Sequence, residues 1–158
     1  MADKPKTILV MRHAEKPDDS NDPNLSKAGH VRAIRLASYI PEKIVQPDFI
    51  MASAVSHSSA RPYETVRPLS KVTSLGVDAT IVDDDYKTLA NELLTNTKYA
   101  GKQVVVCWHH GNIPHLMHQL GAGKGDYPDP WDPAVFNLIL EVTFSDGKVS
   151  VKKVTEPF

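Results

Sequence analysis

An arginine and a histidine stand side by side where the first apolar segment of the chain ends. Arg12 and His13 follow the apolar run 7–10 after a single methionine. An imidazole at such a place can act as a nucleophile, and a neighbouring guanidinium can hold phosphate oxygens through its planar fork of N–H groups. A second histidine, His110, follows a second apolar run at 104–107. Two strand ends that each supply a histidine predict one pocket at the edge of a sheet.

The elements that must position these residues follow from the apolar pattern and the turn signals. Strands are predicted over 6–11, 48–52, 79–82 and 103–108, with a C-terminal hairpin of 136–144 and 148–154 around Asp146 and Gly147. Helices are predicted over 26–40, 56–70, 86–94 and 113–120. Pro41 would close the first helix, and the second helix proper would begin beside Arg61. Strands that alternate with helices predict an α/β fold, a three-layer αβα sandwich with a mostly parallel central sheet and an antiparallel C-terminal hairpin.

Length and charge restrict the class of protein. The 158 residues fit one domain that spans 1–158, and the formal net charge is -1. No overall field therefore attracts nucleic acid or an acidic membrane, and any anion site must be local. One cysteine excludes an internal disulfide, and no apolar stretch has the length of a signal peptide or a membrane span. We therefore expect a cytoplasmic protein with no nucleic-acid or membrane partner.

The predicted topology brings cationic side chains to one rim. Arg12 and His13 follow the first strand, Arg61 lies at a helix start after the second, and His110 follows the strand at 103–108. Ligands of open α/β sheets bind beyond the carboxyl ends of the strands, and helix N-termini favour anions. This combination suits a phosphoryl group or another tetrahedral oxyanion.

Four segments of the chain resemble motifs of the histidine phosphatase superfamily, which has the phosphoglycerate-mutase-like fold. They occur in the order and spacing of that family and cover nearly the whole chain. The segments are 9–15, similar to the Arg-His-Gly signature with Ala14 in place of the glycine; 25–33, similar to a Leu-Ser-x-x-Gly-x-x-Arg-Ala helix start; 59–65, similar to Arg-x-x-x-Thr; and 105–113, similar to the second strand-His-Gly element. The resemblance is to the small single-domain phosphatases of the superfamily.

The resemblance implies a role for each residue. His13 would be the nucleophile that becomes phosphorylated, and Arg12, Arg61 and His110 would hold the phosphoryl oxygens. His110 is chosen over His109 because it precedes the glycine directly, and because His109 in an extended strand would point to the opposite face. The family needs no metal or cofactor for these steps, and we expect none. Since His13 attacks through one ring nitrogen, its other nitrogen should donate to a backbone carbonyl.

A general acid that protonates the leaving oxygen is the remaining role. Asp83, Asp84 and Asp85 follow the strand predicted at 79–82, where such an acid can lie. Asp83 is the first choice, Asp85 the second and Glu15 the third. The simpler interpretation of the three aspartates is a solvated loop.

These residues predict a metal-independent, histidine-type acid phosphatase. It would hydrolyse a phosphomonoester or phosphohistidine through a phospho-His13 intermediate, on a small phosphorylated metabolite or a phosphohistidine protein. The alternatives are a phosphoglycerate-type mutase and a non-catalytic phosphate-binding or interaction domain. Other patterns have simpler interpretations. His110, His115 and His118 are surface histidines rather than a metal cluster, and residues 121–125 are a helix C-terminal turn rather than a nucleotide-binding loop. Arg32 and Arg35 are solvated charges on a helix face, and Thr65 is a structural hydroxyl.

Overall fold

The centre of the sheet is β1 (Thr7–Arg12), whose six residues are all buried. The computed structural model describes residues 3–158, and its six strands are ordered β3-β2-β4-β1-β5-β6. The other strands are β2 (Phe49–Ala52), β3 (Val77–Asp78), β4 (Gln103–Trp108), β5 (Leu138–Ser145) and β6 (Lys148–Thr155). β4 and β5 flank β1, so the first strand has a neighbour on each side.

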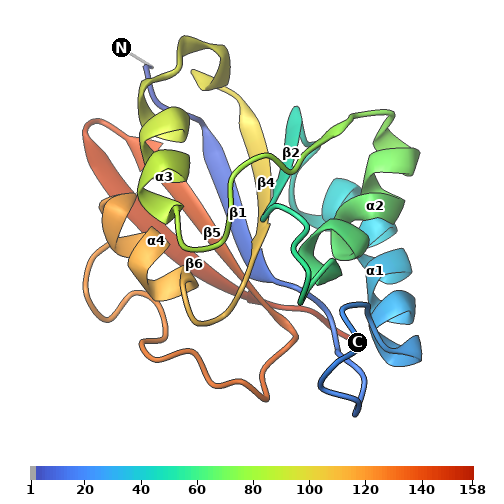
Figure 1. The fold of residues 1–158 in the computed structure, drawn as a ribbon. Coiled ribbons are helices and arrows are strands. Elements are labelled where there is room, and N and C mark those ends of the chain that lie inside the picture. Colours follow the sequence, from blue (N-terminus) through green and yellow to red (C-terminus); the bar gives the residue numbers. More distant parts are fainter. Residues whose placement is uncertain (1–2) are drawn as a thin grey trace.

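Helices cover both faces of this sheet (Figure 1). On one face lie α1 (Lys27–Tyr39) and α2 (Arg61–Thr73), and on the other lie α3 (Tyr86–Thr95) and α4 (Ile113–Gln119). A π-helical turn, η1 (Ile40–Ile44), continues α1, and a short 3-10 turn, η2 (Thr97–Tyr99), precedes β4. The predicted three-layer αβα sandwich is confirmed.

Alternating side chains of β1 enter two separate cores. Leu9 and Met11 pack with α1 and α2, whereas Ile8 and Val10 pack with α3 and α4. Because both faces of the strand are covered, its sequence is a continuous apolar run rather than an alternating one.

Parallel pairing places the carboxyl ends of four strands at one edge. β1 pairs with β4, β4 with β2 and β2 with β3, all in parallel, whereas β5 and β6 add antiparallel pairs. The predicted hairpin turn is confirmed, since Asp146 and Gly147 have φ values of 51° and 75° between the paired Ser145 and Lys148. Two positive φ values in a two-residue loop match the right-handed twist of the strands.

Two predicted elements differ from the structure. The strand predicted at 79–82 is instead the two-residue β3, because the Asp78 carboxylate accepts hydrogen bonds from the backbone N–H and the hydroxyl of Thr80 and so forms a turn. Pro41 does not close the first helix. It lies in the first turn of η1, and the chain coils on until Val45 N–H donates to Ile40 O.

The start of α1 packs directly on the segment that follows β1. Ser26 caps the helix by accepting from Gly29 N–H, and both the N–H and the hydroxyl of Ser26 donate to the carbonyl oxygen of Glu15. A Cβ at position 29 would overlap that carbonyl oxygen. Only glycine therefore allows the helix to approach the backbone two residues after His13 so closely.

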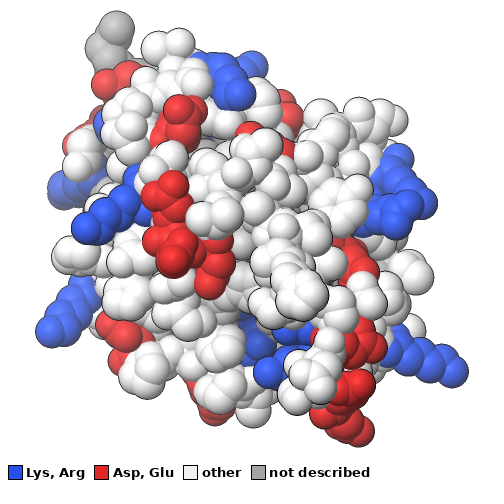
Figure 2. All heavy atoms as spheres, in the orientation of Figure 1, with Lys and Arg blue, Asp and Glu red and all other residues white. Residues whose placement is uncertain are grey.

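Charged side chains of both signs are interspersed over the visible face of the molecule (Figure 2). This distribution agrees with the formal net charge of -1. Any attraction for an anion must therefore come from a local group of cations. Within residues 3–158, no helix has the length and apolar character needed to cross a membrane.

Candidate active site

His13 lies directly beyond the end of β1 and is 3% exposed. Its backbone N–H donates to Trp108 O at 3.1 Å, which keeps the residue against the end of β4. The ring atom Nδ1 lies 2.7 Å from Ala14 O. A carbonyl oxygen can only accept, so Nδ1 carries the proton and Nε2 keeps its lone pair. The predicted bond from the imidazole to a backbone carbonyl is present.

Arg12 is the last residue of β1 and is also 3% exposed. Its Nη1 donates to Pro133 O at 2.7 Å, and its Cζ lies 3.9 Å from the centre of the Phe136 ring. Burial lowers the pKa of Arg12 to about 10, so the guanidinium stays charged at neutral pH. Its Nε is buried and has no hydrogen-bond partner among residues 3–158.

Arg61 begins α2, beyond the loop that follows β2. Its Nη1 donates to Asp22 O at 2.7 Å, and burial lowers its pKa from the ordinary value. Its Nε is likewise buried without a partner in the described part of the chain. Both arginines are therefore anchored by Nη1 to a loop carbonyl, and each keeps a buried N–H donor unused.

His109 lies beside His13, with ring centres 5.3 Å apart and ring planes at 71°. The pKa of His109 is lowered to about 4, mainly by burial and then by the charges of Arg61 and Arg12. His110 follows on the same turn. Its pKa is lowered by burial and then by the charges of Arg12 and Lys16.

Sequence alternation placed His109 on the face opposite His110, away from the site. Alternation holds only within an extended strand, and β4 ends at Trp108. The N–H groups of Asn112 and Ile113 both donate to His109 O, so the two histidines lie on a turn. In the sequence, only the presence of two adjacent histidines after a strand indicated that His109 could belong to the site.

Asp83 is hydrogen-bonded to residues on either side of this turn. Its carbonyl oxygen accepts from Trp108 Nε1 at 2.8 Å, and its Oδ2 accepts from Asn112 Nδ2 at 3.0 Å. Its Oδ1 is buried with no partner among residues 3–158, and burial raises the pKa of the carboxyl. Trp108 therefore holds the segment that carries Asp83.

The other two acid candidates have other partners. Asp85 is exposed and accepts a hydrogen bond from the Thr88 hydroxyl at the start of α3. Both oxygens of the Glu15 carboxylate accept from Arg32, at 2.9 to 3.1 Å. Glu15 is therefore paired at both oxygens, and Asp85 lacks the burial that distinguishes Asp83 Oδ1.

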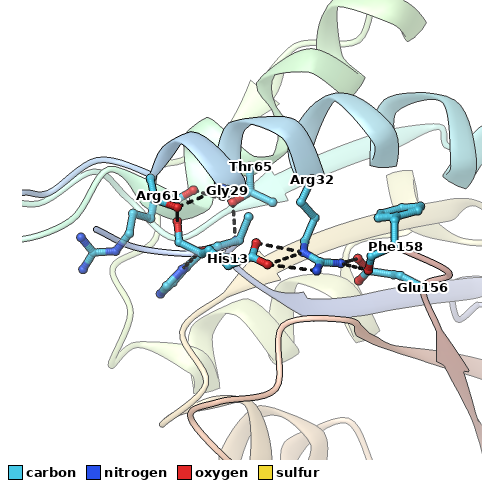
Figure 3. A network of polar contacts seen from close by, with 10 residues as sticks. His13, Gly29, Arg32, Arg61, Thr65, Glu156 and Phe158 are labelled. Atoms are coloured by element: carbon cyan, nitrogen blue, oxygen red, sulfur yellow. Dashed lines mark hydrogen bonds and ion pairs between the residues drawn. The ribbon is translucent and has the colours of Figure 1, made fainter. Parts of the chain in front are cut away.

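Arg32 is not the solvated charge that the sequence predicts. Its side chain is 13% exposed, and besides Glu15 it donates to Glu156 Oε1 and to Phe158 O, both at 2.8 Å. Glu156 is buried, and burial raises its pKa to about 7 although Arg32 opposes the shift. Figure 3 shows this ion-pair network between α1, the segment after His13 and residues 156–158. Helical spacing alone could not reveal it, because its partners lie 17 and 124 positions away in the chain.

The electrostatics of the site keep His13 neutral. Burial lowers its pKa to about 3, the hydrogen bond to Ala14 opposes the shift, and the charge of Arg12, His109 and the charge of Arg61 contribute to it. A neutral imidazole beside two guanidinium groups can attack an electrophile that carries negative charge on its outer oxygens.

Metal binding has no matching geometry here. Within residues 3–158, no group of three or more histidine, cysteine or acidic side chains is placed to hold a metal ion. His115 instead stacks on Tyr86, with ring centres 5.3 Å apart. A cavity of about 520 Å³ lies at the other edge of the sheet, among residues such as Lys4, Leu120 and Phe144. Its lining includes neither His13 nor either of the two arginines of the candidate site.

Comparisons with known proteins identify the fold. No protein-family model matches the sequence, and no curated protein is similar to it. Solved structures similar to this chain include a mycobacterial glucosyl-3-phosphoglycerate phosphatase, at 15% identity and a TM-score of 0.64 over 96% of this chain and 98% of that chain. The protein histidine phosphatase SixA, complexed with tungstate, has 18% identity and a TM-score of 0.64 over 94% of this chain and 96% of its own. A phosphoserine phosphatase variant from Entamoeba histolytica has 12% identity and a TM-score of 0.61 over 92% and 94%.

All three proteins are named as phosphatases, and at identities of 12–18% the likeness to them is one of fold. The fold that the sequence motifs predict is therefore confirmed over nearly the whole chain.

Protonation of the two facing imidazoles provides a direct test of this geometry. We expect His13 and His109 to remain neutral down to about pH 5, since their pKa values are about 3 and about 4. The ring ¹⁵N shifts in an NMR titration would stay those of neutral imidazoles, with the proton of His13 on Nδ1. His13→Asn and His109→Asn assign the signals.

The sign of the effect on stability follows from the same shifts. Both pKa values lie below the value of about 6.5 in an unfolded chain, so the unfolded state takes up protons first as the pH falls. The contribution of these groups to the free energy of unfolding is full above about pH 6.5 and is lost progressively below it. A titration midpoint near pH 6 for His13 would contradict the assignment.

Proposed function

We propose that this chain is a histidine-type phosphatase in which residues 1–158 form one catalytic domain. One observation carries the proposal: a buried, neutral His13, with its proton fixed on Nδ1, lies by two guanidinium groups that each keep a buried N–H unused. Phosphatases of the same fold have structures with tungstate or inorganic phosphate bound, which supports an oxyanion as the ligand.

The reaction would proceed in two displacements at phosphorus. In the first, Nε2 of His13 attacks, the N–P bond forms and the bond from phosphorus to the leaving oxygen, or to the leaving nitrogen of a phosphohistidine, breaks. In the second, water attacks, the P–N bond breaks and inorganic phosphate leaves. Splitting one difficult displacement into two is what a covalent nucleophile achieves.

Arg12, Arg61 and His110 would hold the three outer phosphoryl oxygens. Their N–H donors meet the negative charge of the transferring group, so positioning and electrostatics supply most of the catalysis. The position of His109 beside His13 supports adding it to this set. These donors neutralise the phosphoryl charge without a metal ion, so we propose a metal-independent reaction. A nucleophile that stays neutral in acid fits an acid phosphatase.

Asp83 would protonate the leaving oxygen. Its unpaired Oδ1 and its raised pKa favour the protonated form that a general acid needs. The proton goes to the leaving alcohol in the first step and is recovered from the attacking water in the second. The substrate would be a small phosphorylated metabolite or a phosphohistidine protein, and we retain the prediction of a cytoplasmic location.

Loss of the nucleophile gives the first test of this function. We expect His13→Ala to abolish turnover of p-nitrophenyl phosphate and of phosphomonoesters, because the proposed intermediate forms on Nε2 of His13. Rapid acid quench with ³²P-labelled substrate should trap an acid-labile, alkali-stable label on the wild type only. Near-normal hydrolysis by His13→Ala would refute the mechanism, and rearrangement of a phosphoglycerate without phosphate release would indicate a mutase.

The two neighbouring histidines can be separated by anion binding. We expect His109→Asn to weaken competitive inhibition by tungstate by at least about tenfold, since one hydrogen bond to a charged group contributes about 1.5–3 kcal/mol. We expect a smaller loss for His110→Asn, because the histidine found in ring contact with His13 is His109. Equal inhibition of His109→Asn and the wild type would leave His110 alone in the role.

The general acid can be recognised by its dependence on the leaving group. We expect Asp83→Asn to lower kcat/KM for alkyl phosphates by about 10²–10⁴-fold, the usual range for general acid catalysis. The loss should be much smaller for p-nitrophenyl phosphate, whose leaving group needs little protonation. The exposed neighbour Asp84→Asn is the matched control, and Asp85→Asn tests the second candidate. An equal loss on both substrates would exclude the role of Asp83 as the acid.

A further inference from the structure

Thr65 lies on α2, one helical turn after Arg61, and is 1% exposed. Its hydroxyl contacts two backbone groups that belong to the site. The N–H of Ala14 lies 2.9 Å from Oγ1, and Oγ1 lies 2.8 Å from the carbonyl oxygen of Arg61. Figure 3 shows this pair of contacts between the residue after His13 and the start of α2.

The direction of both bonds is fixed. An amide N–H can only donate and a carbonyl oxygen can only accept, so the single hydroxyl proton of Thr65 must point to Arg61 O. The chain of bonds therefore runs from Ala14 N–H through Thr65 to Arg61. No other side chain in residues 3–158 joins the backbone next to His13 to the backbone of Arg61 in this way.

Ala14 is held on both of its polar groups. Its carbonyl oxygen accepts from Nδ1 of His13 at 2.7 Å, and its N–H donates to Thr65. Ala14 is 1% exposed, so neither group can exchange its partner for bulk water. Losing the Thr65 hydroxyl would leave a buried N–H unpaired, and the backbone would have to move to satisfy it.

We propose that Thr65 is a positioning residue that sets His13 and Arg61 against one another. Its hydroxyl fixes the backbone of Ala14, which orients the His13 imidazole, and the backbone of Arg61, the first residue of α2. Nε2 and the Arg61 guanidinium thereby meet the same phosphoryl group. This inference rests on the proposed function, and it assigns to Thr65 a role beyond that of a structural hydroxyl in the helix.

Thr65→Val tests the proposal, because valine keeps the shape of threonine and removes only the hydroxyl. We expect kcat/KM to fall by about 10–100-fold, since displacements of about 1 Å can cost 10²-fold. The rate of phosphoenzyme formation should fall in parallel, and tungstate should bind more weakly because Arg61 shifts. The Nδ1 proton resonance of His13 should move, which a purely structural loss elsewhere would not cause.

Matched variants separate the hydroxyl from bulk packing. Thr65→Ser retains the hydroxyl and should keep turnover within about threefold of wild type, whereas Thr65→Ala should behave like Thr65→Val. The serine and alanine pair still isolates the hydroxyl should the valine variant fail to fold. Thr73→Val is the control within the same helix, because the Thr73 hydroxyl donates to Leu69 O at 2.7 Å with no contact to the His13 segment. We expect it to leave turnover and the His13 resonance unchanged.

Each outcome decides the proposal. It is overturned by a Thr65→Val variant with wild-type turnover, tungstate affinity and His13 resonance, or by a Thr65→Ser variant as impaired as Thr65→Val. A wild type that forms no phosphoenzyme would overturn the proposed function instead. In that case, tungstate affinity and the His13 resonance of the Thr65 variants still show whether this hydroxyl sets the geometry.

Discussion

The hydrogen bond between Nδ1 of His13 and the carbonyl oxygen of Ala14 decides which ring nitrogen the site can use. A neutral imidazole has one donor and one acceptor, and the backbone takes the donor. Nε2 is then left with its lone pair in a place where burial and neighbouring charges oppose protonation. The other features of the site matter only if this one holds, because a cationic or reversed ring has no nucleophilic nitrogen to present.

Two cations, the buried Arg12 and the half-buried Arg61, impose the second constraint. Removing a guanidinium from water costs free energy unless its N–H donors find partners. Here Nη1 of each arginine donates to a loop carbonyl, and Nε has no partner among residues 3–158. A bound oxyanion would complete both sets of bonds. The chain as a whole is nearly neutral, so the attraction acts at short range, and the anion must enter the pocket to benefit from it.

The sequence could predict those parts of the site that follow strand ends. Arg12 and His13 stand directly after an apolar run, and Arg61 precedes a proline in the first turn of a helix, so local pattern was enough to place them. His109 was misplaced because side-chain alternation was extended one residue past the end of β4. The ion-pair network of Arg32 could not be predicted, because it joins segments that are distant in the chain. In sequence, a charged residue on a helix face has the same pattern whether it is solvated or paired.

The partners that anchor the two guanidinium groups also explain why the loops of this fold matter. Asp22 and Pro133 supply backbone carbonyls, so their side chains carry no signature of the contact. Phe136 adds an aromatic face to Arg12 and lies 6.3 Å from the ring of His13, at the border of the site. The sheet edge therefore fixes where the nucleophile stands, whereas the segments around 22 and 133–136 fix which donors of the arginines remain free. Substrate selection should thus depend more on these irregular segments than on the strands, because they determine what approaches His13.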